Sequence, residues 1–366
     1  GGAAGLYCAM HAGRRGKRVL VIEHNTEVGA KILISGGGRC NFTNLHAAPD
    51  RFISANPHFA RSALARHTQR DFIALVEKHG IPFYEKTLGQ LFCEGARSSR
   101  RIVQMLLDEC ASAGVAIRIA CHVSRVERGD TFRVETTQGA FEANALIIAT
   151  GGLPIPKLGA TGFAFDIAKQ FDVPVVETRP ALVPLTFGEA DLTWMRGLSG
   201  VSADVVARAG KAQFREAALF THRGLSGPSI LQISSYWRPG ESIEIDWLPD
   251  HAPDVLAQRK RERPKAHLKS VLAHMMSERL ASALSETLPQ EAIGDMKDAA
   301  LINAAAKLKA WPLTPVGTEG YAKAEVMAGG IDTNALSQQT METRVVPGLH
   351  FIGEAVDVTG WLGGYN

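Results

Sequence analysis

Short apolar runs alternate along the chain with segments of helical character. Residues 17–23 (KRVLVIE) and 145–150 (ALIIAT) are apolar and rich in β-branched side chains, which is typical of buried parallel strands. Residues 349–352 form a third run of this kind. Ahead of the first run, residues 3–12 are rich in helix formers and are followed by glycines, which predicts a helix that ends there.

Two more helices are predicted in the first third of the chain. Residues 56–80 begin with Asn-Pro and end at a glycine, and residues 99–113 are followed by another glycine. Residues 29–44, in contrast, are expected to form a loop, because the consecutive glycines Gly36, Gly37 and Gly38 disfavour regular structure.

The predicted secondary structure changes twice in the middle of the chain, from strands to helices and back to strands. Extended runs at 115–127, 132–137 and 140–143 are separated by turn residues and predict a small antiparallel meander. Residues 181–250 hold several strand-like runs and no clear helix. The pattern is helical and rich in Lys and Arg from 252 to 310, and it becomes extended again near residue 323.

These changes divide the chain into four segments. Residues 1–180, with the meander at about 115–143, and residues 322–366 alternate strands and helices. Residues 181–250 are β-rich, and residues 251–321 are helical. A length of 366 residues fits about two domains, or one domain with a large insertion. We therefore expect an α/β domain built from the two outer segments and interrupted by a β-rich and a helical insertion.

Composition narrows the class of protein. Hydrophobic residues make up 45% and charged residues 21%, as in ordinary globular proteins. The formal net charge of +3 gives no reason to expect a nucleic-acid or anionic-membrane partner. No apolar run is long enough for a membrane span. The five cysteines contain no C-x-x-C pair, and the histidines lack ligand spacing, so we expect no disulfide framework, no metal site and a cytoplasmic location.

Both ends of the chain look truncated. The sequence opens on Gly1-Gly2-Ala3-Ala4-Gly5 without a preceding strand, and it stops at Gly363-Gly364-Tyr365-Asn366, within a glycine loop. We interpret the sequence as a fragment, with a strand expected before Gly1 and a helix after Asn366.

The N-terminal segment carries the pattern of a dinucleotide site. Gly2 and Gly5 match the second half of G-x-G-x-x-G, in which glycines let the backbone approach a pyrophosphate at a helix N-terminus. Glu23 ends the next strand, where a carboxylate can accept hydrogen bonds from ribose hydroxyls. Glu23 could equally be a solvated residue at a strand end, and a lone G-x-x-G occurs by chance.

Two later segments favour FAD over a nicotinamide dinucleotide. Thr150-Gly151 and Gly353-Glu354 both follow buried strands, where the chain can return to the dinucleotide, and Glu354 could hold a ribityl hydroxyl. The long loop at 29–44 would serve a flavin but not a nicotinamide. Lys31 in this loop could neutralise pyrophosphate charge, or it could be a surface lysine. No second G-x-G-x-x-G follows, so a separate nicotinamide-binding domain is not expected.

The glycine-rich segment at 35–44, called the glycine loop below, also resembles a segment of a known family. Residues 35–44 (SGGGRCNFTN) resemble the S-G-G-G-R-C-N-x-T-N loop of bacterial flavoproteins called HI0933-like or YhiN-like. Residues 219–228 (LFTHRGLSGP) resemble another segment of these proteins. The resemblance continues through residues 328–330, 340–342 and 347–349 to the last glycine loop, and so covers nearly the whole chain.

The resemblance implies an α/β fold of the glutathione-reductase type, with an FAD-binding Rossmann domain interrupted by a β-barrel-like and a helical segment. It also implies FAD-binding roles for the glycine loop, the strand ends and the C-terminal loop. Together with the residues proposed above, the expected cofactor-binding set is Gly2, Gly5, Glu23, Lys31, Ser35, Gly36, Gly37, Gly38, Arg39, Cys40, Asn41, Thr43, Asn44, Val123, Thr150, Gly151, Gly353, Glu354, Asp357, Gly363, Gly364, Tyr365 and Asn366.

Several of these residues have a plainer alternative. The polar side chains of the glycine loop could serve to fold the loop on itself through Asx-turns. Cys40 is better explained as a buried thiol or a flavin neighbour than as half of a catalytic disulfide. Val123 could contact adenine through its backbone, or it could be a core valine. The basic run at 259–265 is better explained as a solvated helix end than as a nucleic-acid contact, because it lacks interleaved aromatics.

The expected activity is that of an FAD-dependent oxidoreductase, with hydride transfer at flavin N5 and a small organic substrate held under the inserted segment. NAD(P)H is a candidate external electron donor. His222 is a candidate proton donor, although a hydrogen-bonded loop residue is the preferred interpretation. Two rival hypotheses are a tRNA-modifying flavoprotein and a flavin-binding protein without turnover.

Overall fold

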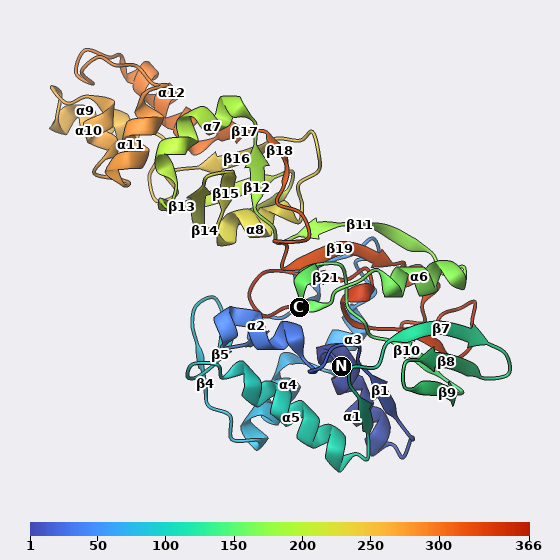
Figure 1. Cartoon of the computed structure of the whole chain (residues 1–366). Helices are drawn as coiled ribbons and strands as arrows, with labels where there is room; N and C mark the ends of the chain where they lie inside the picture. Colours follow the sequence, from blue (N-terminus) through green and yellow to red (C-terminus); the bar gives the residue numbers. More distant parts are fainter. The chain divides into compact units, whose positions relative to one another are not determined.

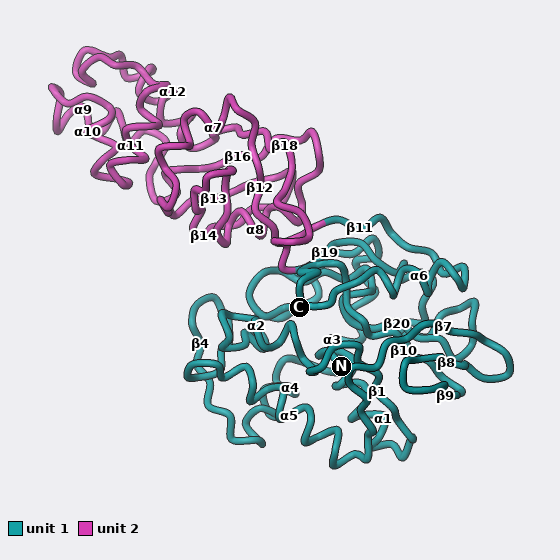
Figure 2. The backbone as a smooth tube through the Cα atoms, viewed as in Figure 1, with its two compact units in different colours: residues 1–179, 326–366 teal, residues 180–325 magenta.

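The computed structural model describes residues 1–366, which divide into two compact units (Figures 1 and 2). Unit 1 contains residues 1–179 and 326–366, and unit 2 contains residues 180–325. Strands β11 (Val175–Ala181) and β19 (Val326–Ile331) pair with each other, and they carry the chain out of unit 1 and back into it.

Unit 1 is a mixed α/β structure (Figure 1). Its helices are α1 (Ala3–Arg14), α2 (Ala30–Gly38), α3 (Arg61–Arg66), α4 (Gln69–Lys78), α5 (Ser99–Ser112) and α6 (Phe163–Gln170). Besides β11 and β19, its strands are β1 (Leu20–Ile22), β2 (Asn41–Asn44), β3 (Phe52–Ile53), β4 (Phe83–Glu85), β5 (Gln90–Cys93), β6 (Ala116–Arg118), β7 (Val123–Arg128), β8 (Phe132–Thr136), β9 (Gly139–Ala143), β10 (Leu146–Ile148), β20 (Leu349–Phe351) and β21 (Thr359–Gly360).

Two parallel strand pairs form the Rossmann part of unit 1. β1 pairs with β6, with Leu20 opposite Ala116, and β10 pairs with β20, with Leu146 opposite Leu349. Parallel strands need crossover connections, and here helices provide them, as in other dinucleotide-binding folds. The antiparallel meander β7–β8–β9 is a separate sheet of the same unit.

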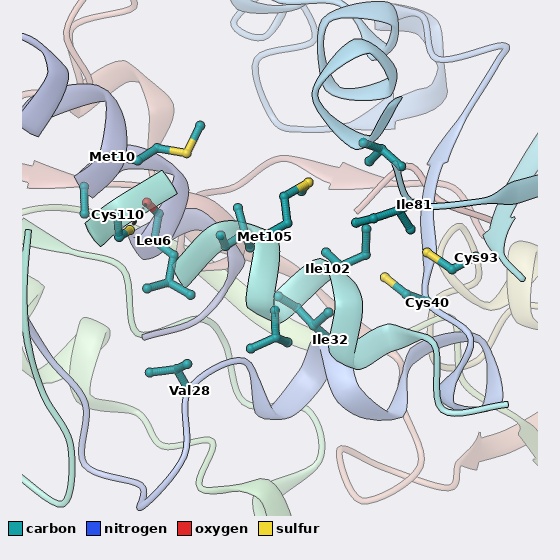
Figure 3. Packing of buried hydrophobic residues seen from close by; sticks show 14 of the residues in the cluster. Leu6, Met10, Val28, Ile32, Cys40, Ile81, Cys93, Ile102, Met105 and Cys110 are labelled. Carbon is teal, nitrogen blue, oxygen red and sulfur yellow. Dashed lines mark hydrogen bonds between the residues drawn. The ribbon is translucent and has the colours of Figure 1, made fainter. Parts of the chain in front are cut away.

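The core of unit 1 forms where α1 packs on α5. Leu6 and Met10 of α1 lie against Ile102, Met105 and Cys110 of α5, and all five are at most 2% exposed (Figure 3). Complete burial of one such side chain stabilises the fold by about 1.5–3 kcal/mol.

A buried carboxylate ties three helices of this core together. Glu109 of α5 accepts hydrogen bonds from Lys78 Nζ (2.9 Å) and His79 Nε2 (2.7 Å) at the end of α4, and it also pairs with Arg14 of α1. Because charge-assisted partners surround the carboxylate, Glu109 is accommodated at 4% exposure.

Unit 2 contains one antiparallel sheet and a helical part. The sheet has the order β17-β16-β13-β14-β15-β12-β18, and only Thr314 separates the two edge strands in the sequence. The two edges must therefore lie close together, so the sheet curls as a barrel-like segment requires. The elements are β12 (Leu185–Phe187), β13 (Ser202–Ala209), β14 (Ala212–Thr221), β15 (Gly224–Ser226), β16 (Ile243–Asp246), β17 (Trp311–Leu313), β18 (Pro315–Thr318), α7 (Glu189–Met195), α8 (Pro228–Ser234), α9 (Val255–Glu262), α10 (Leu268–Leu272), α11 (Glu278–Ser285) and α12 (Asp298–Lys309).

Many predicted elements are confirmed. Helices form at α1 and α5, strands form at β1, β10, β19 and β20, and residues 252–310 are largely helical. The predicted loop at 29–44 is wrong in part, because it begins with the helical residues 30–34 and ends in β2.

Three other predictions of secondary structure need correction. The helix expected at 56–80 is two helices, α3 and α4, separated at His67 and Thr68. The run at 115–127 contains two strands, and β6 joins the parallel pair instead of the meander. Residues 181–250 contain the helices α7 and α8, where no helix was expected.

Candidate functional site

The N-terminus of α1 offers an open anion-binding position. Gly2 is the N-cap residue in an extended conformation, and a Cβ placed there would meet no atom within 4 Å. The first turn of α1 has no acidic side chain and no side-chain cap, so its amide groups face outward unpaired. At Gly5, α1 packs closely on the residue that follows β10. A Cβ added at Gly5 would lie 3.3 Å from Ala149 Cβ.

Glu23 lies at the same end of α1. Its Oε1 atom accepts a hydrogen bond from the Asn25 backbone N–H (2.8 Å), and its Oε2 atom is 3.1 Å from the Gly1 nitrogen. The side chain is 11% exposed, so it is not a freely solvated strand-end residue. This position beside the first glycines suits a carboxylate that binds ribose hydroxyls.

Lys31 and Glu354 lie together in an ion pair. Lys31 Nζ is 2.7 Å from Glu354 Oε2, and Glu354 Oε1 accepts a hydrogen bond from the Met327 backbone N–H (3.2 Å). Gly353 comes close to the first turn of α1, since its Cβ would lie 2.7 Å from Ala4 Cβ. The two side chains were predicted to contact different parts of the cofactor, and the structure places them in one cluster beside the α1 N-terminus.

The glycine loop starts as a helix and then reverses direction. Ser35 leaves the helical conformation, and Gly36 and Gly37 follow with φ of +57° and +66°. A Cβ at Gly36 would lie 2.6 Å from the Phe92 ring, so only glycine fits there. A Cβ at Gly37 would meet nothing within 4 Å, which leaves this stretch of backbone accessible to a ligand.

Asn41, Thr43 and Asn44 hold the C-terminal loop. Asn44 Nδ2 donates to Gly363 O (2.8 Å), and Asn44 Oδ1 accepts from His46 N–H (2.8 Å) in an Asx-turn. With the Asn41 amide turned so that its nitrogen faces the Thr43 and Leu91 carbonyls, its Oδ1 accepts from Gly364 N–H (3.1 Å). Gly364 has φ of +95°, and its Cβ would lie 2.3 Å from Thr43 O. The side chains of Asn41 and Asn44, which were expected to bind the flavin, therefore bond to the chain's own backbone and shape the loop.

The last residues continue this arrangement. Asn366 Oδ1 accepts from Gly360 N–H (2.8 Å), and its Nδ2 donates to Gly360 O (2.9 Å). The Tyr365 ring packs edge-on against Phe52 at 6.2 Å between centroids. Thr359 Oγ1 donates to Met327 O (2.9 Å), which connects this loop to the cluster around Glu354.

Asp357 is a buried carboxyl that lies shortly before the last glycine loop in the sequence. Its Oδ2 atom accepts from Ala55 N–H (2.8 Å), and the side chain is only 4% exposed. Burial raises the pKa of this carboxyl, and the nearby Asp332 charge adds to the shift. Asp357 thus supports the turn before α3 from within the protein.

The cysteines of the glycine loop are packing groups. Cys40 is 5% exposed, and burial raises the pKa of its thiol. Cys93 N–H donates to Cys40 O (3.4 Å), and burial, with a smaller effect of Cys40, raises the pKa of the Cys93 thiol to about 12. Both thiols lie at the edge of the apolar core (Figure 3), so neither is a reactive thiolate at neutral pH.

Four other predicted site residues, Arg39, Val123, Thr150 and Gly151, have separate surroundings. Arg39 Nη1 donates to the Tyr84 hydroxyl (3.1 Å) at the surface. Val123 begins β7 and packs against the second apolar core of unit 1, as a core valine would. Thr150 is exposed, and Gly151 next to it turns with φ of +73° near Glu354.

His222 belongs to unit 2. It forms, with Arg223, the two-residue turn between β14 and β15, and its side chain is exposed without a hydrogen bond. The turn is held by Thr221 Oγ1, which accepts from Arg223 N–H (3.2 Å). The preferred sequence interpretation, a hydrogen-bonded loop imidazole, does not describe this side chain.

Sequence reasoning missed two contributors to the site. The Met327 backbone N–H donates a hydrogen bond to Glu354. The Gln90 side chain packs against Gly363, where an added Cβ would lie 2.8 Å from it. Neither residue has a chemical signature in the sequence, since one acts through its backbone and the other through packing. No three or more His, Cys, Asp or Glu side chains gather in a way that could hold a metal ion.

Comparison with known proteins places the chain in a family. It is 48% identical to a ribosomal RNA dihydrouridine synthase of Escherichia coli and 46% identical to one of Haemophilus influenzae, over all of this chain and 92% of each relative. It is 26% identical to a 3-dehydro-bile acid delta(4,6)-reductase of Clostridium scindens, over all of this chain and 93% of that protein. No helix of the protein combines the length and apolarity needed to span a membrane.

The family model for the HI0933-like protein Rossmann domain matches residues 1–366. This match confirms the predicted fold class, with its FAD-binding Rossmann fold, and the predicted enzyme class of FAD-dependent oxidoreductases. The chain belongs to the HI0933-like family of flavoproteins.

Proposed function

We propose that this protein reduces uridine in ribosomal RNA to dihydrouridine, with FAD as its cofactor. The observation that carries the proposal is the 48% identity, over the whole chain, to a relative named as a ribosomal RNA dihydrouridine synthase. The expectation of no nucleic-acid partner rested on the small net charge and on the lack of aromatics in the basic run at 259–265, and these relatives oppose it. The rival hypothesis of an RNA-modifying flavoprotein is therefore preferred, with ribosomal RNA in place of tRNA.

Two relatives with different substrates suggest one type of chemistry. Uracil has a C5=C6 double bond conjugated with its C4 carbonyl, and a 3-dehydro bile acid with double bonds at positions 4 and 6 is likewise a conjugated ketone. In both, the carbon remote from the carbonyl is electron-poor and accepts a hydride. Reduced FAD, when bound, supplies this hydride at N5.

The reaction on uridine balances as follows. A hydride adds to C6, a proton adds to C5, and the C5=C6 π bond is lost, while the cofactor loses two electrons. The cycle then needs a two-electron donor, for which we propose NAD(P)H.

The unit 1 site offers a cofactor-binding arrangement for this chemistry. We propose that the unpaired amides of α1 and the Lys31 ammonium bind the pyrophosphate. Glu23 would bind the adenosine ribose, and the open backbone near Gly37 would lie along the flavin. Glu354 would hold Lys31 and accept a ribityl hydroxyl. We propose His222, an exposed imidazole in the turn between β14 and β15, as the source of the proton for C5.

A single-turnover experiment tests this function. Full-length protein is reduced without oxygen and mixed with deproteinised ribosomal RNA from an E. coli strain that lacks its own relative. We expect the flavin to be reoxidised and dihydrouridine to form in equal amount, measured by mass spectrometry of the nucleosides. Transfer RNA and RNA already modified by the relative are the controls. Flavin that stays reduced with every RNA would refute the proposal.

A second candidate function is reduction of a small conjugated ketone. The 26% identity to the bile-acid reductase favours it over other small-molecule reactions. Rapid reoxidation by a 4,6-unsaturated 3-ketosteroid, without any by ribosomal RNA, would support this candidate. Prior reduction of the flavin by NADPH or NADH, followed as bleaching of its absorbance, tests the donor independently of the acceptor.

A further inference from the structure

One short segment of unit 2 carries a strong excess of positive charge. Residues 255–275, which contain α9 and α10, hold six Lys or Arg and one acid, a formal charge of +5. The whole chain carries +3, so the remaining residues sum to −2. The net charge of the whole chain therefore does not reveal the local basic surface formed by residues 255–275. We call it the α9–α10 surface.

The apolar side chains of this segment fix its orientation. Val255 and Leu256 of α9, and Leu268, Val271 and Leu272 of α10, are all buried. Arg261, Lys265 and Lys269 are exposed. The basic side of the segment therefore faces solvent, and it has no exposed apolar stripe that could enter a lipid layer.

The available acids neutralise only part of this surface. Glu262, the one acid in the segment, pairs with Arg259 (2.6 Å), and Asp298 of α12 pairs with Lys260 (2.9 Å). Arg261, Lys265 and Lys269 have no ion pair. Like charges that repel one another without a neutralising partner favour the binding of a polyanion.

A hollow of about 330 Å³ lies within this surface. Its lining includes Arg259, Arg263, Val271 and His274, and the Arg263 guanidinium contacts the His274 ring. Guanidinium groups are planar donors that suit phosphate oxygens, so the hollow offers a position for one phosphate of a chain that follows the exposed cations.

We propose that the α9–α10 surface binds the phosphate backbone of structured ribosomal RNA. This inference rests on the proposed function, because it names the part of the protein that holds that substrate. Residues 255–275 contain no Phe, Tyr or Trp, so no aromatic ring can stack on a base. Binding by this surface is therefore sensitive to salt and tolerant of sequence, while the choice of the target uridine belongs to the catalytic site.

A pair of charge-matched triple variants tests this surface. The first changes Arg261, Lys265 and Lys269 to Gln on the α9–α10 surface. The control changes Arg15, Lys17 and Arg18 to Gln, three exposed cations without ion pairs in unit 1. Both variants lose the same formal charge, so a general effect of charge alters both equally. RNA binding is measured by electrophoretic mobility shift with deproteinised ribosomal RNA at several salt concentrations.

We expect the first variant to bind ribosomal RNA roughly tenfold or more weakly near 150 mM salt, with a salt slope smaller by about 2–3. The control is expected to stay within about twofold of the wild type. Equal weakening of both variants, or of neither, would overturn the proposal. So would loss of binding to phosphatidylserine vesicles with RNA binding intact, since the surface would then be a membrane contact.

The catalytic readout separates this inference from the proposed function. In single turnovers, the first variant is expected to need more ribosomal RNA for half-maximal flavin reoxidation, with the same maximal rate and the same FAD content. If the wild-type protein forms no dihydrouridine, the proposed function fails, whereas the binding result still decides the role of the surface. A lower maximal rate without weaker binding would contradict a role in holding RNA.

Discussion

Lys31 Nζ lies 2.7 Å from Glu354 Oε2, although 323 residues separate the two side chains in the sequence. The ion pair joins the start of α2 to the turn after β20, beside the first turn of α1. Glu354 also binds the Met327 backbone N–H, so one carboxylate connects three separate segments of unit 1. The last return of the chain to unit 1 is therefore required to complete this cluster, which we propose as part of the cofactor site.

Replacement of Glu354 by Ala should weaken FAD binding roughly tenfold or more. The change removes a charge-assisted hydrogen-bond acceptor, worth about 1.5–3 kcal/mol, and leaves the Lys31 ammonium without its partner. Titration of FAD into apoprotein measures the effect. Glu142→Ala removes an exposed carboxylate on β9 that pairs with Arg133, and it serves as the control with unchanged affinity. Wild-type affinity in the Glu354 variant would remove this carboxylate from the site.

Gly364→Ala and Gly95→Ala form a matched pair. The two glycines have φ of +95° and +91°, so Ala has a similar conformational cost of about 1–2 kcal/mol at either position. Only at Gly364 would the new Cβ strike a backbone atom, Thr43 O, at 2.3 Å. We expect Gly364→Ala to lower the free energy of unfolding by about 1–3 kcal/mol more than Gly95→Ala, in urea titrations. Equal losses would mean that the loop moves aside freely.

Asn44→Asp should loosen the C-terminal loop. The amide nitrogen donates to Gly363 O and Leu88 O, and a carboxylate in its place would face two carbonyls without a proton to share. The expected loss is about 1–3 kcal/mol of unfolding free energy, together with weaker FAD binding. Asn56→Asp, at an exposed amide, should change stability by less than about 0.5 kcal/mol. The proposed role of the amide would fail if both variants behaved alike.

These contacts mark the limit of prediction from sequence. Local signals identify α1, β1, β10 and β20, because apolar runs and glycines act within a few residues. The break between α3 and α4 also has a local signal, since Asp71 accepts a hydrogen bond from Thr68 N–H (2.7 Å) at a helix start. Pro228 at the first position of α8 is another unused signal.

The roles of the site residues depended on distant parts of the chain. The sequence motif around Asn44 indicated a loop with a special role, but the partner of Asn44, Gly363, lies more than 300 residues later. Without the topology, a polar side chain in a glycine loop is assigned to the ligand, although it can serve the loop itself. Neither the concentration of charge at α9–α10 nor its unpaired cations could be judged from the net charge.

Asp357 should make stability depend on pH in the acidic range. Burial raises the pKa of its carboxyl in the folded protein, so the proton is held more tightly there than in the unfolded chain. The stabilising contribution is full below the unfolded pKa, and it is lost as the pH rises through the folded pKa. Between pH 4 and 7 we therefore expect the wild type to lose stability relative to Asp357→Asn, in thermal unfolding followed at each pH. A constant difference would mean that Asp357 does not titrate in this range.

His222→Gln tests the proposed proton donor. The imidazole is exposed at a hairpin tip and makes no hydrogen bond, so its loss should leave the fold and FAD binding intact. If it protonates C5 of uridine, flavin reoxidation by ribosomal RNA should slow by about 10²–10⁴-fold. Arg223→Gln alters the neighbouring position of the same turn and should retain the wild-type rate. A His222→Gln rate equal to the wild type at every pH would assign the proton to another group and leave this turn only a role in the β14–β15 hairpin.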